Sequence, residues 1–495
     1  MERFRRLRQK SGLTRGILTS QPKEPLRNSA ICGAGPYQIE NVKVTATGYY
    51  TNNTPSGAMR TFGVLQPTFA IESLMDICSE KLGIDPIELR MINGMKDGAV
   101  THTRQVLGKV AYTETLKKCS EIAGWEVGSS RVRGSVRKDI KGSQIAEPYI
   151  PGKEFKSEEA MKLCRDRFKY GRGVGTGWYG IGRCATIDKA GAFVEIDDGG
   201  TAMILTGVSE IGEGILTVLT QIAADELGMY PEDITIGDND TARVPEAAHV
   251  GASRQTYMIG NAVCNACRDV KKKFIREMAA YWNIDSSSIC MKNRRIYVEG
   301  NAQYNLSLKE AVDICKKIRG IVPLGSGTYT AHHEGLDPVD GRGNPWQAYV
   351  FGTQIAEVAV DTFTGEVHVL GIWAAHDVGR VINPRGVEGQ IEGGAVQSMG
   401  QTIMENYVLS EGVPTNKNFA KYILPTSVDV PEIHSYLVEE RDPFSPVGAK
   451  GIGEPAPLPT APAIVNAIYD AVGVRITSLP AIPEKILNEI SKMKN

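Results

Sequence analysis

The carboxylate of Glu454 lies in a stretch whose composition could hold it against a reacting group. Gly451 and Gly453 precede it, and prolines follow it at every second position as far as Pro459. Glycine lets the backbone approach a ligand closely and proline forbids a helix, so the segment is a loop of fixed shape. A carboxylate on such a loop can serve as a general base. The competing interpretation is a solvated glutamate on a surface turn, because most glutamates lie at the surface.

Three other segments combine glycines with small or polar residues. They are Glu210–Thr217 (EIGEGILT), His249–Thr256 (HVGASRQT) and Gly386–Gln397 (GVEGQIEGGAVQ), and each is predicted to lie where a helix begins. Free N–H groups and the helix dipole favour an anion at such a place. In the third segment Gln390 lies between glycines. Together with the Glu454 loop, these turns could surround a large, anionic ligand that makes many hydrogen bonds.

Other motifs are interpreted as structural. Cys264 and Cys267 form a CxxC, but a zinc or iron–sulfur site usually needs a second pair, so they are predicted to be buried helix cysteines. His332 and His333 are adjacent, and adjacent side chains on a strand point apart. Gly171–Gly177 (GRGVGTG) lacks the strand and acidic residue of a dinucleotide loop.

The bulk composition narrows the class of protein. A chain of 495 residues is expected to form two or more domains, and 42% hydrophobic with 23% charged residues is typical of a soluble globular protein. A net charge of −1 favours neither a nucleic-acid nor a membrane partner, and the longest apolar runs are too short to span a bilayer. Nine scattered cysteines suit a reducing compartment, and the cytoplasm is predicted.

Strands and helices alternate irregularly along the chain, which favours an α+β class with two or more subdomains. Residues 1–30 show no periodicity and are predicted to be an irregular arm. A strand is expected after Gln38, and TFTGE (Thr362–Glu366) should be the turn of a β-hairpin. Helices are predicted at Phe69–Gly83, Asp85–Met95, Tyr112–Trp125, Ile215–Leu227, Asn261–Trp282, Pro384–Met404 and Ala461–Gly473.

The chain resembles the xanthine dehydrogenase and aldehyde oxidoreductase family of molybdenum hydroxylases. The resemblance extends from about Pro36 to the C-terminal region, with the motifs in the family's order and at similar spacing. The motifs are TPSGAMRTFGVLQ (Thr54–Gln66), EIGEG, VGASRQTYMIGNAV (Val250–Val263), HDVGRVINPRGVEGQIEGGAVQ (His376–Gln397) and AKGIGEP (Ala449–Pro455).

The resemblance implies a molybdenum–pyranopterin cofactor, with the cytosine dinucleotide form as one alternative. Glu454 matches the family's catalytic base, and Gln390 matches a glutamine that hydrogen-bonds a molybdenum oxygen. Phe62 matches a ring that stacks on the substrate, and Arg60 would face the same side if their turn is extended. Molybdenum is expected near Arg60, Gln390 and Glu454. The cofactor-binding positions are matched by Arg60, Gly212, Glu213, Gly214, Gly251, Ala252, Ser253, Gln390 and Gly453.

The chain departs from the family pattern at several positions. Glu213 replaces a neutral glutamine, so it would need a proton or a cationic partner. Thr61 replaces a glycine in the Arg-x-Phe-Gly turn. The family's second stacking phenylalanine is not found near Cys184, and its purine-orienting arginine is not matched by Arg27.

The expected function is hydroxylation of an electron-poor carbon of an aromatic N-heterocycle (purine- or nicotinate-like) or of an aldehyde, with water as oxygen source. The alternatives are a non-catalytic assembly subunit or fragment of the same fold, and a simple binding module. The family's first molybdenum-domain half should precede residue 1, so a split or truncated subunit is predicted. Its expected partners are a chain carrying that half, a 2Fe-2S subunit and an FAD subunit.

The resemblance also implies a division into domains. Residues 1–130 would be the remainder of a first molybdenum-cofactor domain, 131–170 a linker or insertion, and 171–495 a second molybdenum-cofactor-binding domain.

Overall fold

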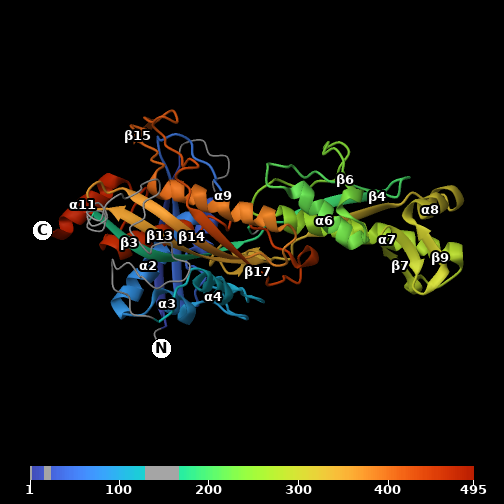
Figure 1. The fold of residues 1–495 in the computed structure, drawn as a ribbon, viewed down its shortest axis with the longest axis horizontal. Coiled ribbons are helices and arrows are strands. Elements are labelled where there is room, and N and C mark those ends of the chain that lie inside the picture. The colour runs from blue at the N-terminus through green and yellow to red at the C-terminus, as the bar shows by residue number, and fades with distance from the viewer. Residues whose placement is uncertain (1–2, 16–23, 129–166, 185, 495) are drawn as a thin grey trace, which may run out of the picture.

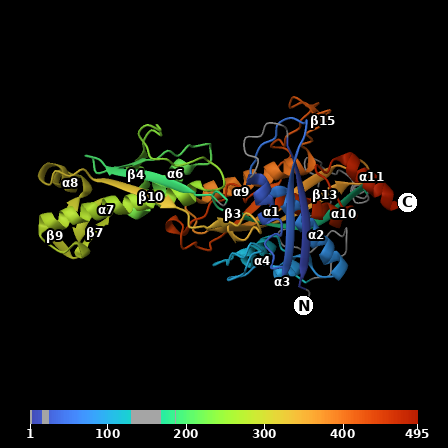
Figure 2. The same cartoon turned by 180° about the vertical axis from the view of Figure 1, so that it is seen from behind.

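The computed structural model describes residues 3–15, 24–128, 167–184 and 186–494. The described chain forms an elongated molecule with two lobes (Figures 1 and 2). One lobe holds both ends of the chain and a four-stranded sheet of order β17-β14-β13-β3, and the other holds a four-stranded sheet of order β10-β4-β5-β6. Helices and mixed sheets confirm the α+β class.

The lobe with the chain ends combines the first and last parts of the sequence. Its sheet consists of β3 (Phe168–Gly180), β13 (Tyr349–Asp361), β14 (Val367–Asp377) and β17 (Glu432–Val438). Its helices are α1 (Glu24–Cys32), α2 (Leu65–Leu82), α3 (Pro86–Asn93), α4 (Tyr112–Ile122), α9 (Pro384–Ile403), α10 (Thr460–Val472) and α11 (Pro483–Lys494). Three two-stranded sheets in the described residues pair the remaining strands of this lobe: β1 (Arg6–Arg15) with β2 (Asn41–Tyr50), β11 (Gly335–Leu336) with β12 (Gly343–Asn344), and β15 (Leu409–Ser410) with β16 (Val413–Pro414).

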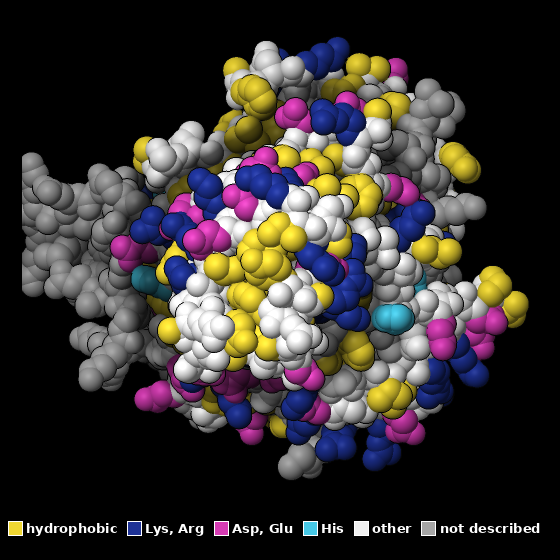
Figure 3. All heavy atoms as spheres, turned by 90° about the vertical axis from the view of Figure 1, so that its right-hand side faces the viewer, with side chains coloured by type: hydrophobic (Ala, Val, Ile, Leu, Met, Phe, Trp, Pro, Cys, Tyr) yellow, Lys and Arg dark blue, Asp and Glu magenta, His cyan; other side chains and the backbone are white. Residues whose placement is uncertain are grey.

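The second lobe is built from the middle of the chain. Its main sheet consists of β4 (Lys189–Ile196), β5 (Ala202–Leu205), β6 (Ile234–Ile236) and β10 (Leu324–Thr330), with β7 (Ile289–Lys292), β8 (Arg295–Val298) and β9 (Asn301–Ser307) as a separate three-stranded sheet. Its helices are α6 (Ile215–Leu227), α7 (Gly260–Trp282) and α8 (Leu308–Asp313). Figure 3 views the far end of this lobe, where apolar side chains gather at the centre among charged ones.

Glycines let one helix lie directly on the backbone of β3. Gly171, Gly173 and Gly175 alternate along the strand and face α10. A Cβ atom on Gly173 would lie 2.2 Å from the carbonyl oxygen of Ala463 and 2.2 Å from the nitrogen of Ala467. The GRGVGTG segment is therefore a packing surface for α10. This agrees with the sequence analysis, which did not interpret the segment as a nucleotide-binding loop. Because α10 begins six residues after Glu454, this contact also fixes the end of the Glu454 loop.

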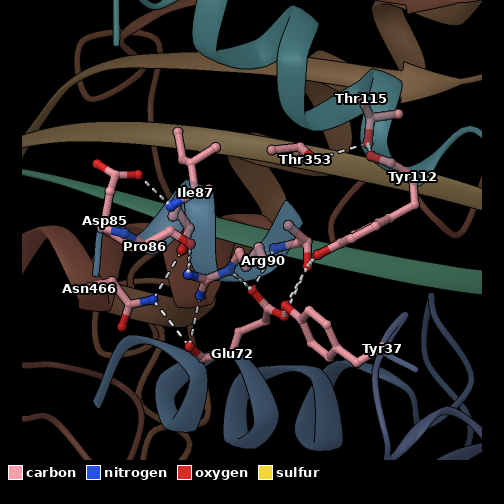
Figure 4. Close-up of polar contacts among 12 residues, drawn as sticks. Tyr37, Glu72, Asp85, Pro86, Ile87, Arg90, Tyr112, Thr115, Thr353 and Asn466 are labelled. Atoms are coloured by element: carbon pink, nitrogen blue, oxygen red, sulfur yellow. Dashed lines mark hydrogen bonds and ion pairs between the residues drawn. The ribbon is translucent and has the colours of Figure 1, made fainter. Parts of the chain in front are cut away.

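A buried polar network covers the open edge of β3 (Figure 4). Glu72 of α2 accepts hydrogen bonds from Arg90 Nε at 2.8 Å and from the backbone nitrogen of Thr176 at 2.9 Å. Tyr37 donates to the same carboxylate, and Asn466 of α10 donates to the carbonyl of Val174 at 3.0 Å. The Glu72 and Arg90 side chains are fully buried. Burial of two charged groups costs desolvation free energy. Their mutual attraction and the further hydrogen bonds offset that cost here.

Most local predictions are confirmed. The predicted helices are present, α2 ends at Gly83 with φ +66°, and the TFTGE turn joins the antiparallel strands β13 and β14. The prediction of an irregular arm at residues 1–30 is wrong, because this segment contains β1 and most of α1. Strand β1 pairs in parallel with β2, about 35 residues later in the chain. A pairing between such distant segments cannot be recognised from the residues of β1 alone.

The predicted linker and the predicted lack of a membrane-spanning segment can be compared only with the residues that the structure describes. The predicted linker lies outside them except at its end, where Phe168–Tyr170 already belong to β3. In the described part of the chain, no helix is long and apolar enough to cross a bilayer.

Candidate active site

A cavity of about 520 Å³ brings the predicted segments together. Its walls come from the start of α6 and the loop before α7 in the second lobe, and from α9 and the Glu454 loop. Nine predicted site residues line it: Arg60, Gly212, Glu213, Gly214, Gly251, Ser253, Gln390, Gly453 and Glu454. Segments more than 390 positions apart in the sequence thus meet at one place, as a single ligand site requires.

Glu454 is buried, with 8% of its surface exposed, so the surface-turn interpretation is wrong. Its Oε1 accepts a hydrogen bond from the Ala252 nitrogen at 2.6 Å, and its Oε2 accepts one from the Tyr179 hydroxyl. Its own backbone nitrogen donates to Ser253 Oγ at 2.9 Å. Burial raises the pKa of the Glu454 carboxyl, while the two donors and the charge of Arg60 limit that rise. A raised pKa moves a carboxylate toward the range of an effective general base.

The loop opposite Glu454 has an unusual backbone. Gly251, Ala252 and Ser253 all have positive φ, at +147°, +57° and +51°. Non-glycine residues adopt such angles only when their surroundings enforce them, and they cluster at functional sites. The next residue, Arg254, anchors this loop, because its buried guanidinium pairs with the carboxylate of Asp188 at 2.8 Å. The result is an N–H group and a hydroxyl aimed at the Glu454 loop.

Arg60 links two of the predicted segments. Its Nε donates to the carbonyl of Gly453 at 2.5 Å, and one terminal nitrogen donates to Gln390 Oε1 at 3.0 Å. Burial lowers the pKa of Arg60, and the nearby Glu454 raises it. The guanidinium therefore contacts both the Glu454 loop and the side chain of Gln390. Gln390 lies in the second turn of α9.

The turn that carries Arg60 is tight, so the extended form considered for it is wrong. Thr61, Phe62 and Gly63 have φ values of +85°, +48° and +88°, and the Phe62 nitrogen donates to the carbonyl of Met59 at 2.8 Å. The threonine that replaces the family glycine thus keeps a conformation that suits glycine. As a result Arg60 lines the large cavity, while Phe62 lines a neighbouring one of about 90 Å³ together with Ala252.

The EIGEG segment is arranged differently from the sequence prediction. The carboxylate of Glu210 accepts from the nitrogens of Gly212 and Gly214, both at 2.9 Å, and so takes the N–H groups assigned to a ligand anion. Glu213 accepts from Gln255 Nε2 at 2.9 Å, so its partner is an amide and not a cation. Burial and the neighbouring Glu210 raise the pKa of Glu213. The raised pKa makes Glu213 easier to protonate than an exposed glutamate.

Two residues of the site were missed by sequence reasoning. Tyr179 contacts the Glu454 carboxylate from β3, and nothing in the sequence around it signals this. Gln255 lies inside the HVGASRQT segment, so attention to its polar residues could have found it. Gln255 lines the cavity with 7% of its surface exposed, and its Oε1 is buried without a hydrogen-bond partner. An unpaired buried acceptor suits a ligand rich in N–H groups, as a pterin is.

The Cys and His motifs are placed as follows. Cys264 and Cys267 are fully buried in α7, which confirms them as helix core residues. His333 is half-buried near Thr186. Among the described residues, no three His, Cys, Asp or Glu side chains gather as a metal site.

Replacing Tyr179 with Phe is expected to shift the pH dependence of catalysis. The phenol stays protonated, because burial and Glu454 raise its pKa, so it stabilises the ionised form of Glu454. Losing that donor raises the pKa of Glu454 further. If Glu454 acts as a base, the acid limb of kcat/KM should move up by about one pH unit. Tyr112→Phe, a buried tyrosine on α4, is the control. An acid limb that does not move would contradict the role given to Tyr179.

Comparisons with known proteins agree with this geometry. Family models described as molybdopterin cofactor-binding domains match residues 14–94 and 150–431. The chain is similar to a probable xanthine dehydrogenase subunit from Bacillus subtilis, with 32% identity over 93% of this chain and 56% of that protein. It is also similar to an aldehyde oxidoreductase from Megalodesulfovibrio gigas, with 30% identity over 94% of this chain and 45% of that protein.

Solved structures give the same result. The crystal structure of the aldehyde oxidoreductase from Desulfovibrio desulfuricans matches 98% of this chain and 47% of that chain, with a TM-score of 0.78 and 27% identity. The chain spans about half the length of the curated relatives it matches. The motifs, the cavity that unites them and the family models lead to one conclusion. The chain belongs to the molybdopterin cofactor-binding family, in its xanthine dehydrogenase and aldehyde oxidoreductase group.

Proposed function

We propose that this chain is the catalytic part of a molybdenum hydroxylase. The observation that carries the proposal is the buried Glu454 carboxylate at the wall of a cavity of about 520 Å³ that the cofactor-binding segments also line. When bound, the molybdenum cofactor supplies the oxidising power and the oxygen that enters the product, which derives from water. Glu454 accepts a proton at its carboxylate as the electron-poor carbon is hydroxylated.

The residues around the large cavity suit a pyranopterin cofactor. Gln255 Oε1 is an unpaired acceptor, and Arg60 and Gln390 provide side chains that can hydrogen-bond the ligand's oxygens. Gly212 and Gly214 have positive φ and open space where a side chain would be, so the ligand can approach the backbone there. When it is protonated, the Glu213 carboxyl offers one O–H donor and a carbonyl acceptor, in place of the two N–H donors and the carbonyl acceptor of a glutamine amide.

The substrate is proposed to lie beside Phe62, between the small cavity and Glu454. A flat ring stacked on that phenyl group gains about 0.5–1.5 kcal/mol beyond simple burial. Ala252 borders both regions, because its nitrogen donates to Glu454 while the residue lines the small cavity. An aromatic N-heterocycle or an aldehyde on a flat ring fits this arrangement.

The partners and the division into domains are proposed on the family's pattern. Electrons would pass to an iron–sulfur subunit and an FAD subunit, and a further polypeptide segment would complete the cofactor site. Residues 1–130 and 171–495 would belong to the first and second cofactor-binding domains. The alternative of a non-catalytic assembly subunit is less favoured, because such a subunit has no need of a buried carboxylate with a raised pKa.

The experiment that tests this function follows the origin of the oxygen. The complex isolated from its native source should hydroxylate a flat heterocycle or aldehyde in water enriched in oxygen-18, with an artificial electron acceptor and without air. The product is expected to carry oxygen-18. Product formed with unlabelled oxygen, or only in the presence of air, would contradict the proposal.

A further inference from the structure

The loop that carries Glu454 starts against the end of β14. Gly379, two positions after that strand, forms an isolated antiparallel bridge with Ala449. The backbone nitrogen of Lys450 donates a hydrogen bond to the carbonyl of Val378 at 2.9 Å. Gly379 permits this contact with a φ of +63°, in the left-handed region that suits glycine. The chain is therefore fixed to the end of β14 four residues before Glu454.

A buried ion pair lies beside this bridge. Lys450 Nζ contacts Asp377 Oδ2 at 2.6 Å, and the two side chains are 3% and 0% exposed. The Gly379 nitrogen donates to Asp377 Oδ1 at 3.2 Å. Burial raises the pKa of Asp377, and the charge of Lys450 lowers it. Burial of two charges costs desolvation free energy, and apolar residues of similar volume often stabilise a fold equally well. What the pair adds is a fixed distance between β14 and the loop.

The position of Lys450 reaches Glu454 through Ser253. A Cβ atom on Gly451, the next residue, would lie 2.0 Å from the carbonyl oxygen of Ser253, so the two backbones touch. Ser253 Oγ in turn accepts a hydrogen bond from the backbone nitrogen of Glu454 at 2.9 Å. The loop is thus held between the end of β14 and Ser253, and a shift of Lys450 displaces Glu454.

The far end of the loop has a separate support. Gln354 Nε2 donates to the carbonyl of Ala456 at 2.9 Å, and Thr460 Oγ1 donates to Gln354 Oε1 at 2.6 Å. His376 Nε2 lies 3.2 Å from the same amide nitrogen and accepts from it, because burial lowers the pKa of His376 to about 3 and leaves the ring neutral. These contacts do not involve Lys450. Without the ion pair the loop should therefore turn about its far end and stay folded.

We propose that Asp377 and Lys450 are positioning residues whose ion pair holds the Glu454 carboxylate in place for catalysis. They act through the backbone of the loop and not on the reacting atoms. Lys450 lines the large cavity, but Asp377 compensates its charge, which leaves it little to offer an anionic ligand. The inference rests on the proposed function, because it takes Glu454 as the base.

The double variant Asp377→Leu with Lys450→Met provides the test. Its melting temperature should equal or exceed that of the wild type, because an apolar pair replaces two buried charges. Its kcat/KM, expressed per molybdenum atom, should fall about 10²-fold, since a displacement of about 1 Å at a catalytic group has that effect. The acid limb of kcat/KM should move up by about one pH unit, because Glu454 stays buried while its hydrogen bonds from Ala252 and Tyr179 weaken.

Hydrogen exchange gives a readout that needs no turnover. The backbone amides of residues 450–458, followed by mass spectrometry on the intact complex, should exchange about tenfold faster in the double variant than in the wild type. Asp377→Asn keeps the shape of the side chain and is a second variant, in which the acid limb and the exchange should change in the same direction. The molybdenum content of both variants should be unchanged.

Arg167→Met is the control for the loss of an ion pair as such. Arg167 pairs with Asp361, which lies at the opposite end of the same sheet. This variant should have a lower melting temperature. Its acid limb and the exchange of residues 450–458 should stay as in the wild type.

The outcomes separate the two proposals. A rate per molybdenum atom equal to that of the wild type, an acid limb that stays in place, exchange that stays slow, or equal shifts in Arg167→Met would overturn the inference. Loss of molybdenum from the double variant would also overturn it, and would assign Lys450 to the cofactor. Faster exchange with full molybdenum, in a complex whose wild type hydroxylates neither a heterocycle nor an aldehyde, would support the role of the pair in holding the loop and count against the proposed function.

Discussion

Replacing Glu454 with Gln should lower kcat by about 10²- to 10⁴-fold or more. The amide has nearly the size of the carboxylate and still offers an oxygen to the Ala252 N–H group, but it cannot accept a proton. The cavity is therefore expected to keep its shape and its cofactor. The measurements are kcat with saturating substrate and the molybdenum content of the same preparation.

Stability provides an internal check on this variant. Because the folded state raises the pKa of Glu454, its ionised form is less favourable in the folded than in the unfolded protein. That cost is absent below the unfolded pKa and is fully present above the folded pKa. At neutral pH the uncharged glutamine should therefore not lower the melting temperature. Glu392→Gln, on the exposed side of α9, is the control, and a near-normal kcat for Glu454→Gln would exclude it as the base.

Adding one methyl group at Gly173 should have a large effect from a distance. The new Cβ would meet backbone atoms of Ala463 and Ala467 at 2.2 Å, and neither helix nor strand can yield by moving a side chain. The helix α10 must shift, and the Glu454 loop that precedes it shifts as well. A displacement of about 1 Å at a catalytic group can cost roughly 10²-fold in rate, so we expect a loss of that size in kcat/KM together with a lower melting temperature.

Gly393→Ala is the matched control for this change. Gly393 lies inside α9, and a Cβ atom there meets no atom within 4 Å. Alanine in a helix interior is about 1 kcal/mol more favourable than glycine, so this variant should be as stable as the wild type or more so. If Gly173→Ala turns over substrate as fast as the control does, then the packing of α10 on β3 does not position Glu454.

The features that sequence could predict are those set by neighbours along the chain. The helix α2 ends where Gly83 permits a left-handed residue, and α3 begins where the Asp85 side chain accepts hydrogen bonds from the nitrogens of Ile87 and Glu88. Both signals are local, so they can be recognised without the fold. The four glycine-rich segments were also found in this way, and the family's order of motifs linked them to one site.

The features that sequence could not predict depend on distant contacts. Tyr179 donates to a carboxylate 275 positions away, and β1 is a strand only because β2 lies beside it. The turn at Thr61 is tight although a β-branched residue disfavours its φ of +85°. The free N–H groups expected before α6 are taken by Glu210, since a side chain of the same loop can fold back onto them.

The most direct measurement is the metal and pterin content of the complex that contains this chain, isolated from its native source. Stoichiometric molybdenum and pyranopterin are expected, because the large cavity unites the nine predicted residues with the unpaired Gln255 acceptor. Glu454→Gln should retain both in the same amounts. A folded, intact complex that contains neither molybdenum nor a pterin would contradict the assignment of this cavity to the cofactor.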